Sequence, residues 1–454
     1  MVVLTSPRIV KEVLDLRGSS TADRPDTHIG SIVTGGLDIT IAHHGPAWKK
    51  MRRALHDVLT KEACMNHLPI QRAEATQLMY DLLVTPERFY THLRRYASSV
   101  IMCVSFGIHC DRYEHPYIED FYDTLRKWEA LMGPGGHPPV DMFPILKYVP
   151  ERWAKWKSVS REIRDNQTKL RYALMDACTR RIKDDRRNGC FLEHILDHQQ
   201  EYGLTDEMVG HVGSALMQAG ADTTAVYLQM FVLCMIAHPE IQRRAQKEID
   251  SVIGKDRTPV FDDINDLPYV RAIIDEVHRF RPITPTALPH KAMEDERVDN
   301  YLLPKGALIF MNTWGIYHDD NLFENPDIFN PDRFLRSEFG TKPGVDISNF
   351  RNDLVFGAGR RICPGSHLAT NSIILNVMNL LWAFELSSPK DPNTGESTPV
   401  DLNDLTTGVL IMPKPFKCQI TPRSETRAEL IRTEFAEAKA TFSCFEHDLV
   451  TMQT

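Results

Sequence analysis

The chain has 454 residues, of which 42% are hydrophobic and 25% charged, as in an ordinary globular protein. A formal net charge of −8 argues against wholesale binding of nucleic acid. Nine cysteines without regular spacing argue against a disulfide-stapled secreted protein and favour a reducing, intracellular compartment. No run of 18 apolar residues occurs, so we expect no transmembrane helix.

The first two thirds of the sequence are predicted to be mainly helical. Ser6 and Pro7 are typical of a helix start, and Gly18 can end that helix. A second helix is expected to begin at Pro46. Residues 205–237 predict an unusually long helix, because about 33 residues would span roughly 50 Å. Such a helix must run through the body of the protein.

From Pro282 onwards, short β-like runs alternate with turn residues. Residues 304–306, Pro-Lys-Gly, predict a hairpin turn, and residues 364–386 predict a last strong helix. GVLIM at 408–412 and KCQIT at 417–421 are expected to form a strand pair. The predicted fold class is therefore mainly α with a minor β portion.

The stretch FGAGRRICPG surrounds Cys363 with glycines and arginines. Pro364 suits the first position of the following helix, whose free N–H groups would favour the thiolate. Gly357 and Gly359 let the loop bend and lie close to a flat partner, and Arg361 could hold a carboxylate. This combination suits a planar macrocycle with acidic side groups, such as haem, for which a cysteine thiolate is a known axial ligand.

Zinc is the rival interpretation of the same stretch. Cys363 and His367 lie four residues apart, as two ligands on one helix face would. A structural zinc site needs two more ligands with recognisable spacing, and no Cys-x-x-Cys pair exists. We therefore rank zinc well below haem.

AGADTT lies near the middle of the long predicted helix. Asp222 and Thr223 compete with the backbone for hydrogen bonds, and Gly220 costs on the order of 1 kcal/mol against alanine. Taken alone, the motif is explained by close packing and solvent-facing polar groups. At the centre of a buried helix, the same residues favour a gap for a ligand and a hydroxyl–carboxylate pair that relays protons.

Three other motifs are weak evidence of a functional site when each is taken alone. Glu276 and Arg279 of EVHR have the spacing of an ordinary surface ion pair, and Arg333 lies in the loop FNPDRF. Trp48 and Arg52 of WKKMR lie four residues apart on one predicted helix face. They indicate either an amphipathic basic helix or an anchor for an anionic ligand.

In this order the motifs resemble those of the cytochrome P-450 family of haem-thiolate monooxygenases, and most of all its fungal microsomal type. FGAGRRICPG is similar to the family's haem-binding loop at Phe356, Gly359, Arg361, Cys363 and Gly365. AGADTT, EVHR and PDRF resemble its oxygen-activation motif, its Glu-x-x-Arg pair and its later arginine loop. The resemblance implies the cytochrome P-450 fold, with haem b between the long central helix and the cysteine loop.

The resemblance also implies roles for the motif residues. Cys363 would be the axial ligand of the haem iron, and Thr223 with Asp222 would be catalytic, supplying protons for the cleavage of dioxygen. The remaining haem-binding residues would be Trp48, Arg52, His290, Arg361, Phe356, Gly357, Gly359 and Gly365, the first four at the propionates.

Two further sets of positions follow from the resemblance. Glu276, Arg279 and Arg333 would form a structural network behind the haem. Substrate contacts would come from residues 25–42, 128–145, 215–223, 283–288 and 404–408.

The implied activity is insertion of one atom of dioxygen into a small lipophilic substrate, in fungal secondary metabolism. Electrons would come from NADPH through an NADPH-cytochrome reductase. Lys49, Lys50 and Arg53 could help to attract this acidic partner, or could equally form an ordinary solvated helix face. The alternatives are a haem-thiolate isomerase or peroxygenase and a non-catalytic haem-binding relative. The intact Asp222-Thr223 pair counts against the isomerase and the peroxygenase.

The domain expectation is a single cytochrome P-450 domain over residues 1–454. Microsomal members begin with a membrane anchor, a first helix and a first strand, which we expect to be lacking here because VVLTS resembles the strand that follows them. For a full-length relative, we expect association with the endoplasmic reticulum membrane.

Overall fold

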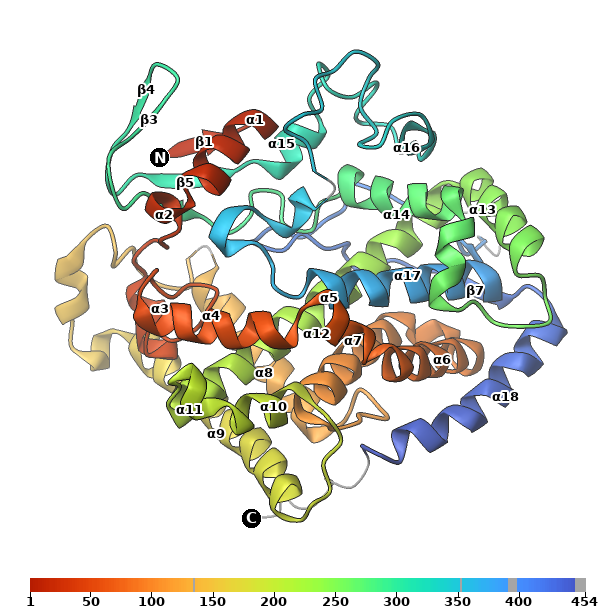
Figure 1. Ribbon diagram of the computed structural model, residues 1–454, viewed down its shortest axis with the longest axis horizontal. Coiled ribbons are helices and arrows are strands. Elements are labelled where there is room, and N and C mark those ends of the chain that lie inside the picture. The colour runs from red at the N-terminus through yellow and green to blue at the C-terminus, as the bar shows by residue number, and fades with distance from the viewer. Residues whose placement is uncertain (134, 352, 391–397, 446–454) are drawn as a thin grey trace.

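The computed structural model describes residues 1–133, 135–351, 353–390 and 398–445, and helices dominate it, as the fold class predicted (Figure 1). The α-helices are α1 (Pro7–Val10), α2 (Gly18–Thr21), α3 (His28–Thr34), α4 (Pro46–Val58), α5 (Lys61–Met65), α6 (Leu68–Val84), α7 (Phe89–Phe106), α8 (Pro116–Met132), α9 (Lys155–Lys183), α10 (Phe191–Asp197), α11 (Gln199–Tyr202), α12 (Asp206–Ala237), α13 (Pro239–Val252), α14 (Pro268–Phe280), α15 (Thr313–Tyr317), α16 (Asp332–Arg336), α17 (Ser366–Ala383) and α18 (Glu425–Phe442). The strands are β1 (Val2–Leu4), β2 (His290–Lys291), β3 (Glu296–Val298), β4 (Tyr301–Leu303), β5 (Leu308–Met311), β6 (Phe384–Ser387) and β7 (Gln419–Pro422).

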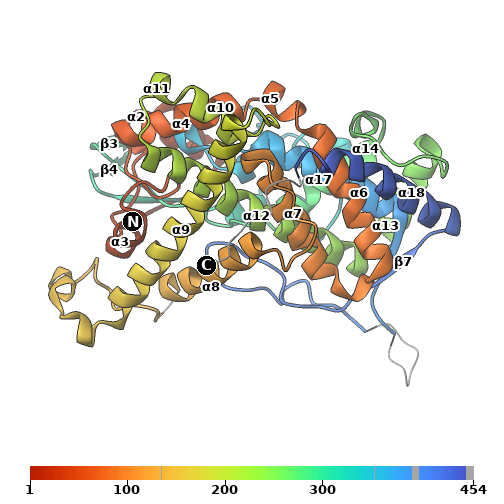
Figure 2. The same cartoon turned by 90° about the horizontal axis from the view of Figure 1, so that it is seen from below.

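Helix α12 runs through the interior, as its length predicted (Figures 1 and 2). The Thr205 side chain caps it by accepting from the Met208 N–H, and two acidic residues occupy its first turn. Among the described residues, α12 alone is long and apolar enough to cross a membrane, but 83% of its most apolar window is buried inside the protein. It is therefore the core helix around which the other helices pack.

The close contact between α12 and α7 depends on Gly220. A Cβ atom at this position would lie 2.6 Å from the Ile101 side chain of α7. The missing side chain thus makes room for a neighbouring helix, and the expected ligand gap is not at Gly220.

The strands form three small sheets. In the largest, β1 pairs with β5 in parallel and β2 pairs with β5 antiparallel, while β3 pairs with β4 and β6 with β7. The predicted hairpin at residues 304–306 is wrong, because this turn leads from one sheet into another. The predicted pairing of 408–412 with 417–421 is also wrong: β7 pairs with β6, directly after α17.

Two helix boundaries differ from the sequence expectation. Gly18 begins α2 instead of ending the preceding helix, which continues from α1 into a π-helical turn, η1 (Lys11–Leu16). Helix α17 begins at Ser366, two residues after Pro364, and ends at Ala383 because the chain then extends into β6. Pairing with β7 therefore overrides the apolar pattern that suggested a longer helix.

A buried ion network joins α14 to α16 and the loop before it. Glu276 accepts from the Arg279 guanidinium over 2.7 and 2.9 Å and from Arg333 Nε over 3.2 Å. The two arginines also donate to backbone carbonyl groups, including those of Tyr317 and Glu324. All three charged side chains are almost completely buried, and the two guanidinium groups share the Glu276 carboxylate.

We predict that Glu276→Gln lowers the free energy of unfolding by roughly 3–5 kcal/mol, because it leaves buried guanidinium charge without its carboxylate. Chemical denaturation of the haem-loaded protein measures this change. The same substitution at Glu162, whose partner Lys127 is exposed, should cost less than about 1 kcal/mol. Equal losses in the two variants would contradict the structural role of Glu276.

Candidate active site

Cys363 lies in a tight loop before α17, and a backbone hydrogen bond joins the two ends of this loop. The Cys363 N–H donates to the Phe356 carbonyl oxygen over 2.8 Å. Gly357 and Gly359 have φ angles of +89° and +62°, which side chains rarely adopt. A Cβ atom on Gly359 would lie only 1.9 Å from the Leu14 carbonyl oxygen. Gly359 therefore makes room for the protein's own backbone, where the sequence interpretation had placed a flat ligand.

The Cys363 thiol is not made acidic by its surroundings. Burial raises its pKa, and the Gly365 N–H and the Arg52 guanidinium, which both lower it, compensate only in part. The expectation that helix N–H groups stabilise the thiolate is weakened because α17 begins three residues after Cys363. A bound metal ion would supply the missing stabilisation, since a coordinating thiol is deprotonated outright.

The residues predicted at the propionates lie close to this loop. Arg361 stacks over the Trp48 ring with its Cζ 4.1 Å from the ring centroid, and both side chains donate to the Ile39 carbonyl oxygen. Arg52 donates to the carbonyl oxygen of Ile362, the residue before Cys363. His290 Nδ1 hydrogen-bonds to the Thr21 carbonyl oxygen over 2.9 Å.

Arg24 completes this group and was missed in the sequence. Its Nε donates to the Thr40 carbonyl oxygen, and its Nη1 to the Pro289 carbonyl oxygen next to His290. Its only sequence signal was an arginine in the turn-like DRPD, which does not distinguish it from any loop arginine. The tertiary fold alone brings it beside Arg361 and His290.

These cations lack acidic partners. Burial lowers the pKa of Arg24 to about 10, and burial together with Arg24 lowers the pKa of Arg361 to about 9. The nearby Asp23 carboxylate is bound by the His43 ring at 3.0 Å. In the described part of the chain no carboxylate lies within 4 Å of Arg24, Arg52 or Arg361. The chemistry of this donor set therefore fits a ligand that brings its own carboxylates.

Thr223 and Asp222 occupy different faces of α12. Thr223 is half-buried, follows the exposed Ala219 by one turn and donates to its carbonyl oxygen over 2.6 Å. Asp222 is 3% exposed and turns into the protein, where burial raises its pKa and Arg94 lowers it. Ala219 is exposed in the middle of a mostly buried helix, which marks interior space there, and Thr223 faces that space while Asp222 does not.

Arg94 is a second residue that the sequence did not reveal. Its Nε lies 3.9 Å from Asp222 Oδ1, too long for a hydrogen bond, and neither atom has a hydrogen-bond partner among the described residues. Its guanidinium also lies over the Tyr122 ring, with Cζ 5.5 Å from the centroid. The hydroxyl group of Tyr122 donates in turn to the Ala221 carbonyl oxygen, which ties α7 and α8 to the AGADTT segment.

The other predicted residues are placed as follows. The Phe356 ring contacts the half-buried His278 edge-on at 5.9 Å, and a Cβ atom at Gly365 would meet nothing within 4 Å. His367 is exposed, and the described residues contain no group of three or more metal-binding side chains of the zinc type. The zinc alternative therefore has no support in the described structure.

Comparisons with known proteins agree with this geometry. Residues 1–420 match the family model described as "Cytochrome P450". A cytochrome P450 monooxygenase of Armillaria gallica is 45% identical over 99% of this chain and 85% of its own length, and one of Penicillium terrestre is 34% identical over 97% and 85%. A zebra fish cytochrome P450 structure with progesterone superimposes with a TM-score of 0.76 at 27% identity, covering 93% of both chains.

The chain belongs to the cytochrome P450 family, and it is an oxidoreductase of the monooxygenase type. The family implies haem as the cofactor. The residues of this chain fit that group, because a cysteine lies together with a set of cations that have no carboxylate within 4 Å in the described structure. A thiolate ligand and two propionate carboxylates are what such a set would bind.

Proposed function

We propose that this protein binds haem b through the Cys363 thiolate and uses electrons from NADPH to oxygenate a small lipophilic substrate. The observation that supports this proposal most directly is the position of Cys363 beside Arg52, within a cluster of buried and half-buried arginines that have no carboxylate within 4 Å in the described chain. Trp48, Arg24, Arg52, His290 and Arg361 would hold the propionates, with Phe356, Gly357, Gly359 and Gly365 shaping the loop around the ligand.

When bound, the haem supplies the redox chemistry that splits dioxygen and inserts one oxygen atom into the substrate. The protein supplies the protons. The Thr223 hydroxyl group faces the interior space and can exchange its bond to the Ala219 carbonyl for a bond to water or ligand. Asp222 would exchange protons with this segment, because burial brings its pKa closer to the working pH. Arg94 opposes that shift and orients the carboxylate.

Electrons would arrive from an NADPH-dependent flavoprotein reductase that docks near the cysteine loop. Lys49 and Arg360 are exposed on α4 and beside Cys363, and they support a docking face for an acidic partner. Of the other cations predicted there, Lys50 donates to the Gly203 carbonyl oxygen and Arg53 pairs with Glu201. Lys50 and Arg53 would therefore add positive charge to the docking face while keeping these contacts within the protein.

We also propose association with the endoplasmic reticulum membrane through the loop between α8 and α9. This loop carries two 3₁₀ turns, η3 (Pro144–Tyr148) and η4 (Glu151–Trp153), and projects from the body of the protein (Figure 2). Five large apolar side chains of this loop are more than half exposed: Met142, Phe143, Ile145, Tyr148 and Trp153. Lys147 and Arg152 between them would face lipid headgroups.

The first prediction of this proposal concerns the ligand. The reduced, CO-bound protein should show the long-wavelength Soret band of thiolate-ligated haem, and Cys363→His should abolish it because imidazole replaces the thiolate. Cys418→Ala is the matched control, since Cys418 is also partly buried and lies on another part of the chain. Persistence of the band in Cys363→His would show that another residue is the ligand.

The second prediction concerns proton delivery. Thr223→Ala should still consume NADPH, but should convert several-fold less of it into product and release the difference as hydrogen peroxide. NADPH, product and peroxide are measured together in the presence of a reductase. Thr224→Ala makes the same chemical change at a buried position one residue further along α12 and should leave the coupling unchanged. Full coupling in Thr223→Ala would remove Thr223 from this role.

The third prediction concerns the membrane. Ile145→Ser with Tyr148→Ser should weaken sedimentation with phosphatidylcholine vesicles at least tenfold, because each buried apolar side chain contributes about 1.5–3 kcal/mol. The control is Tyr301→Ser with Leu302→Ser, which removes two apolar side chains of β4 that are also more than half exposed. If both double variants bind vesicles like the parent protein, the loop is not the membrane contact.

A further inference from the structure

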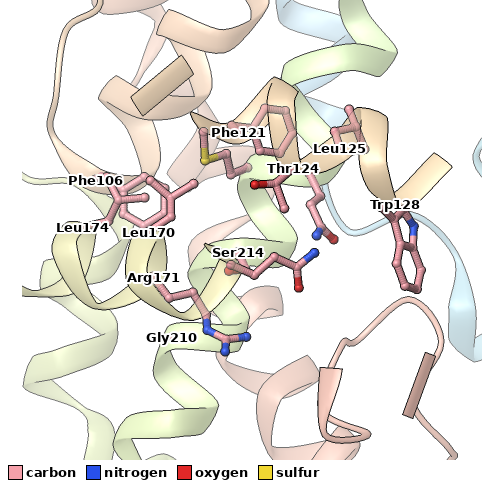
Figure 3. A pocket seen from close by; sticks show the side chains of 13 residues that line it. Phe106, Phe121, Thr124, Leu125, Trp128, Leu170, Arg171, Leu174, Gly210 and Ser214 are labelled. Carbon is pink, nitrogen blue, oxygen red and sulfur yellow. The ribbon is translucent and has the colours of Figure 1, made fainter. Parts of the chain in front are cut away.

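The cavity between α8, α9 and α12 is too small for an organic ligand (Figure 3). It holds ≈ 30 Å³, which is room for a few water molecules at about 10–15 Å³ each. Gln167, Arg171 and Ser214 in its wall are polar residues that such waters can satisfy. The contacts that the proposed function leaves unexplained lie elsewhere, behind the loop of Cys363.

Residues 14–22, near the N-terminus, lie against the cysteine loop. The Leu14 carbonyl oxygen occupies the place that a side chain on Gly359 would need. The Ala22 carbonyl oxygen accepts from Arg361 Nε over 2.8 Å. The segment therefore contacts both ends of the short 3₁₀ turn that leads to the cysteine.

The Asp15 carboxylate binds the backbone of the loop from this segment. Its Oδ1 accepts from the Gly359 N–H over 2.7 Å and from Arg351 Nη1 over 3.1 Å. The Arg351 guanidinium in turn donates to the Gly357 carbonyl oxygen through Nη2. One carboxylate and one guanidinium thus hold the two glycines of the loop that have positive φ angles.

The helical turn that carries Asp15 is itself unusual. It is the π-helical η1, and π-helical turns are rare and occur mostly at functional sites. Its end is fixed by Thr21, whose hydroxyl group donates to the Val13 carbonyl oxygen over 2.8 Å. The Thr21 carbonyl oxygen is also the partner of His290 Nδ1. The same segment therefore joins the cysteine loop to a residue proposed at the propionates.

The loop needs support from outside because its own bonds do not fix its shape. Within it, the Cys363 N–H donates to the Phe356 carbonyl oxygen, and the Ile362 N–H donates to the Gly359 carbonyl oxygen. The Gly359 N–H and the Gly357 carbonyl oxygen are left to Asp15 and Arg351. Since glycine has many conformations open to it, ordering two glycines costs conformational entropy that these outside bonds offset.

We propose that Asp15 is a positioning residue for the haem ligand: together with Arg351 it holds residues 357–359 and thereby keeps the Cys363 thiolate on the iron. The inference deepens the proposed function and rests on ligation by Cys363. Asp15 acts through Gly359 and Arg351, so it orients the ligand and takes no part in the chemistry. Groups that orient a metal ligand in this way typically change metal affinity about 10–100-fold when they are removed.

The haem-loaded full chain with Asp15→Ala tests this role, because the substitution removes the bonds to Gly359 and Arg351 together. Hydrogen exchange in the peptide that contains Gly359, followed by mass spectrometry, should become about tenfold faster. Loss of haem to an excess of a haem-scavenging globin should also become about tenfold faster. Part of the reduced, CO-bound protein should lose the long-wavelength Soret band.

Two further variants separate the hydrogen bond from the charge. Asp15→Asn keeps an oxygen that can accept from the Gly359 N–H, so it should restore most of the exchange protection, haem retention and Soret band. Arg351→Ala removes the bond to Gly357 and leaves the bond to Gly359, so it should show the same three changes to a smaller extent. If Asp15→Ala does not fold, Arg351→Ala still tests the support of the loop.

Glu12→Ala is the matched control. Glu12 also lies on η1 and also pairs with arginines, at 3.2 Å from Arg8 and 2.8 Å from Arg17, but it makes no bond to the cysteine loop in the described structure. This variant should therefore keep the parent protein's exchange in the loop, haem loss and CO-bound spectrum.

Parent-like exchange and haem loss in Asp15→Ala would overturn the proposal. Equal changes in Asp15→Ala and Glu12→Ala would overturn it too, because they would show a general loss of stability. A failure of the proposed function has a different result, since the parent protein itself would then lack the long-wavelength Soret band. In that case the role of Asp15 towards a thiolate ligand is overturned with it.

Discussion

The burial of positive charge is the constraint on which the structure depends. At Glu276 the protein supplies its own carboxylate, and the resulting network joins α14 to the segment around Arg333. Around Cys363, Arg24 and Arg361 are held only by backbone carbonyl oxygens, which accept hydrogen bonds but carry no full charge. This contrast separates a network that the chain completes alone from a site that a ligand with its own carboxylates would complete.

Helix α12 organises the site because its faces have different neighbours: a packed helix, a buried arginine partner and the interior space. Gly220 lets α7 pack against it, and Asp222 points into the protein towards Arg94, while Ala219 and Thr223 border the interior space. Adjacent residues of a helix point about 100° apart, so the pair Asp222-Thr223 cannot share one face. The proton exchange that we propose between them would therefore have to pass along the helix surface, through groups such as water that can enter that space.

Much of the fold could be predicted from local patterns. The cap at Thr205, the apolar length that follows and Pro239 after it are sufficient to identify α12, because these signals act within the helix itself. Strand partners could not be predicted in this way. β6 continues directly from α17 and pairs with β7, and residues 304–306 join two sheets, because pairing is decided by segments far apart in the sequence. The same limit applies to Gly359, whose conformation is required by Leu14, 345 residues earlier.

The sequence by itself determined the family and the identity of the motif residues, because Cys363, AGADTT and EVHR have informative spacings and the chain belongs to the cytochrome P450 family. Only the tertiary structure decided which other residues join them. Arg24 and Arg94 stand in stretches that look like any loop or helix surface. Arg24 became significant because it is buried with no carboxylate of the described chain within 4 Å, and Arg94 because it lies 3.9 Å from the buried Asp222 carboxylate. The physical reason is that the free-energy cost of burying a charged side chain depends on the groups around it. Those groups come from distant parts of the chain.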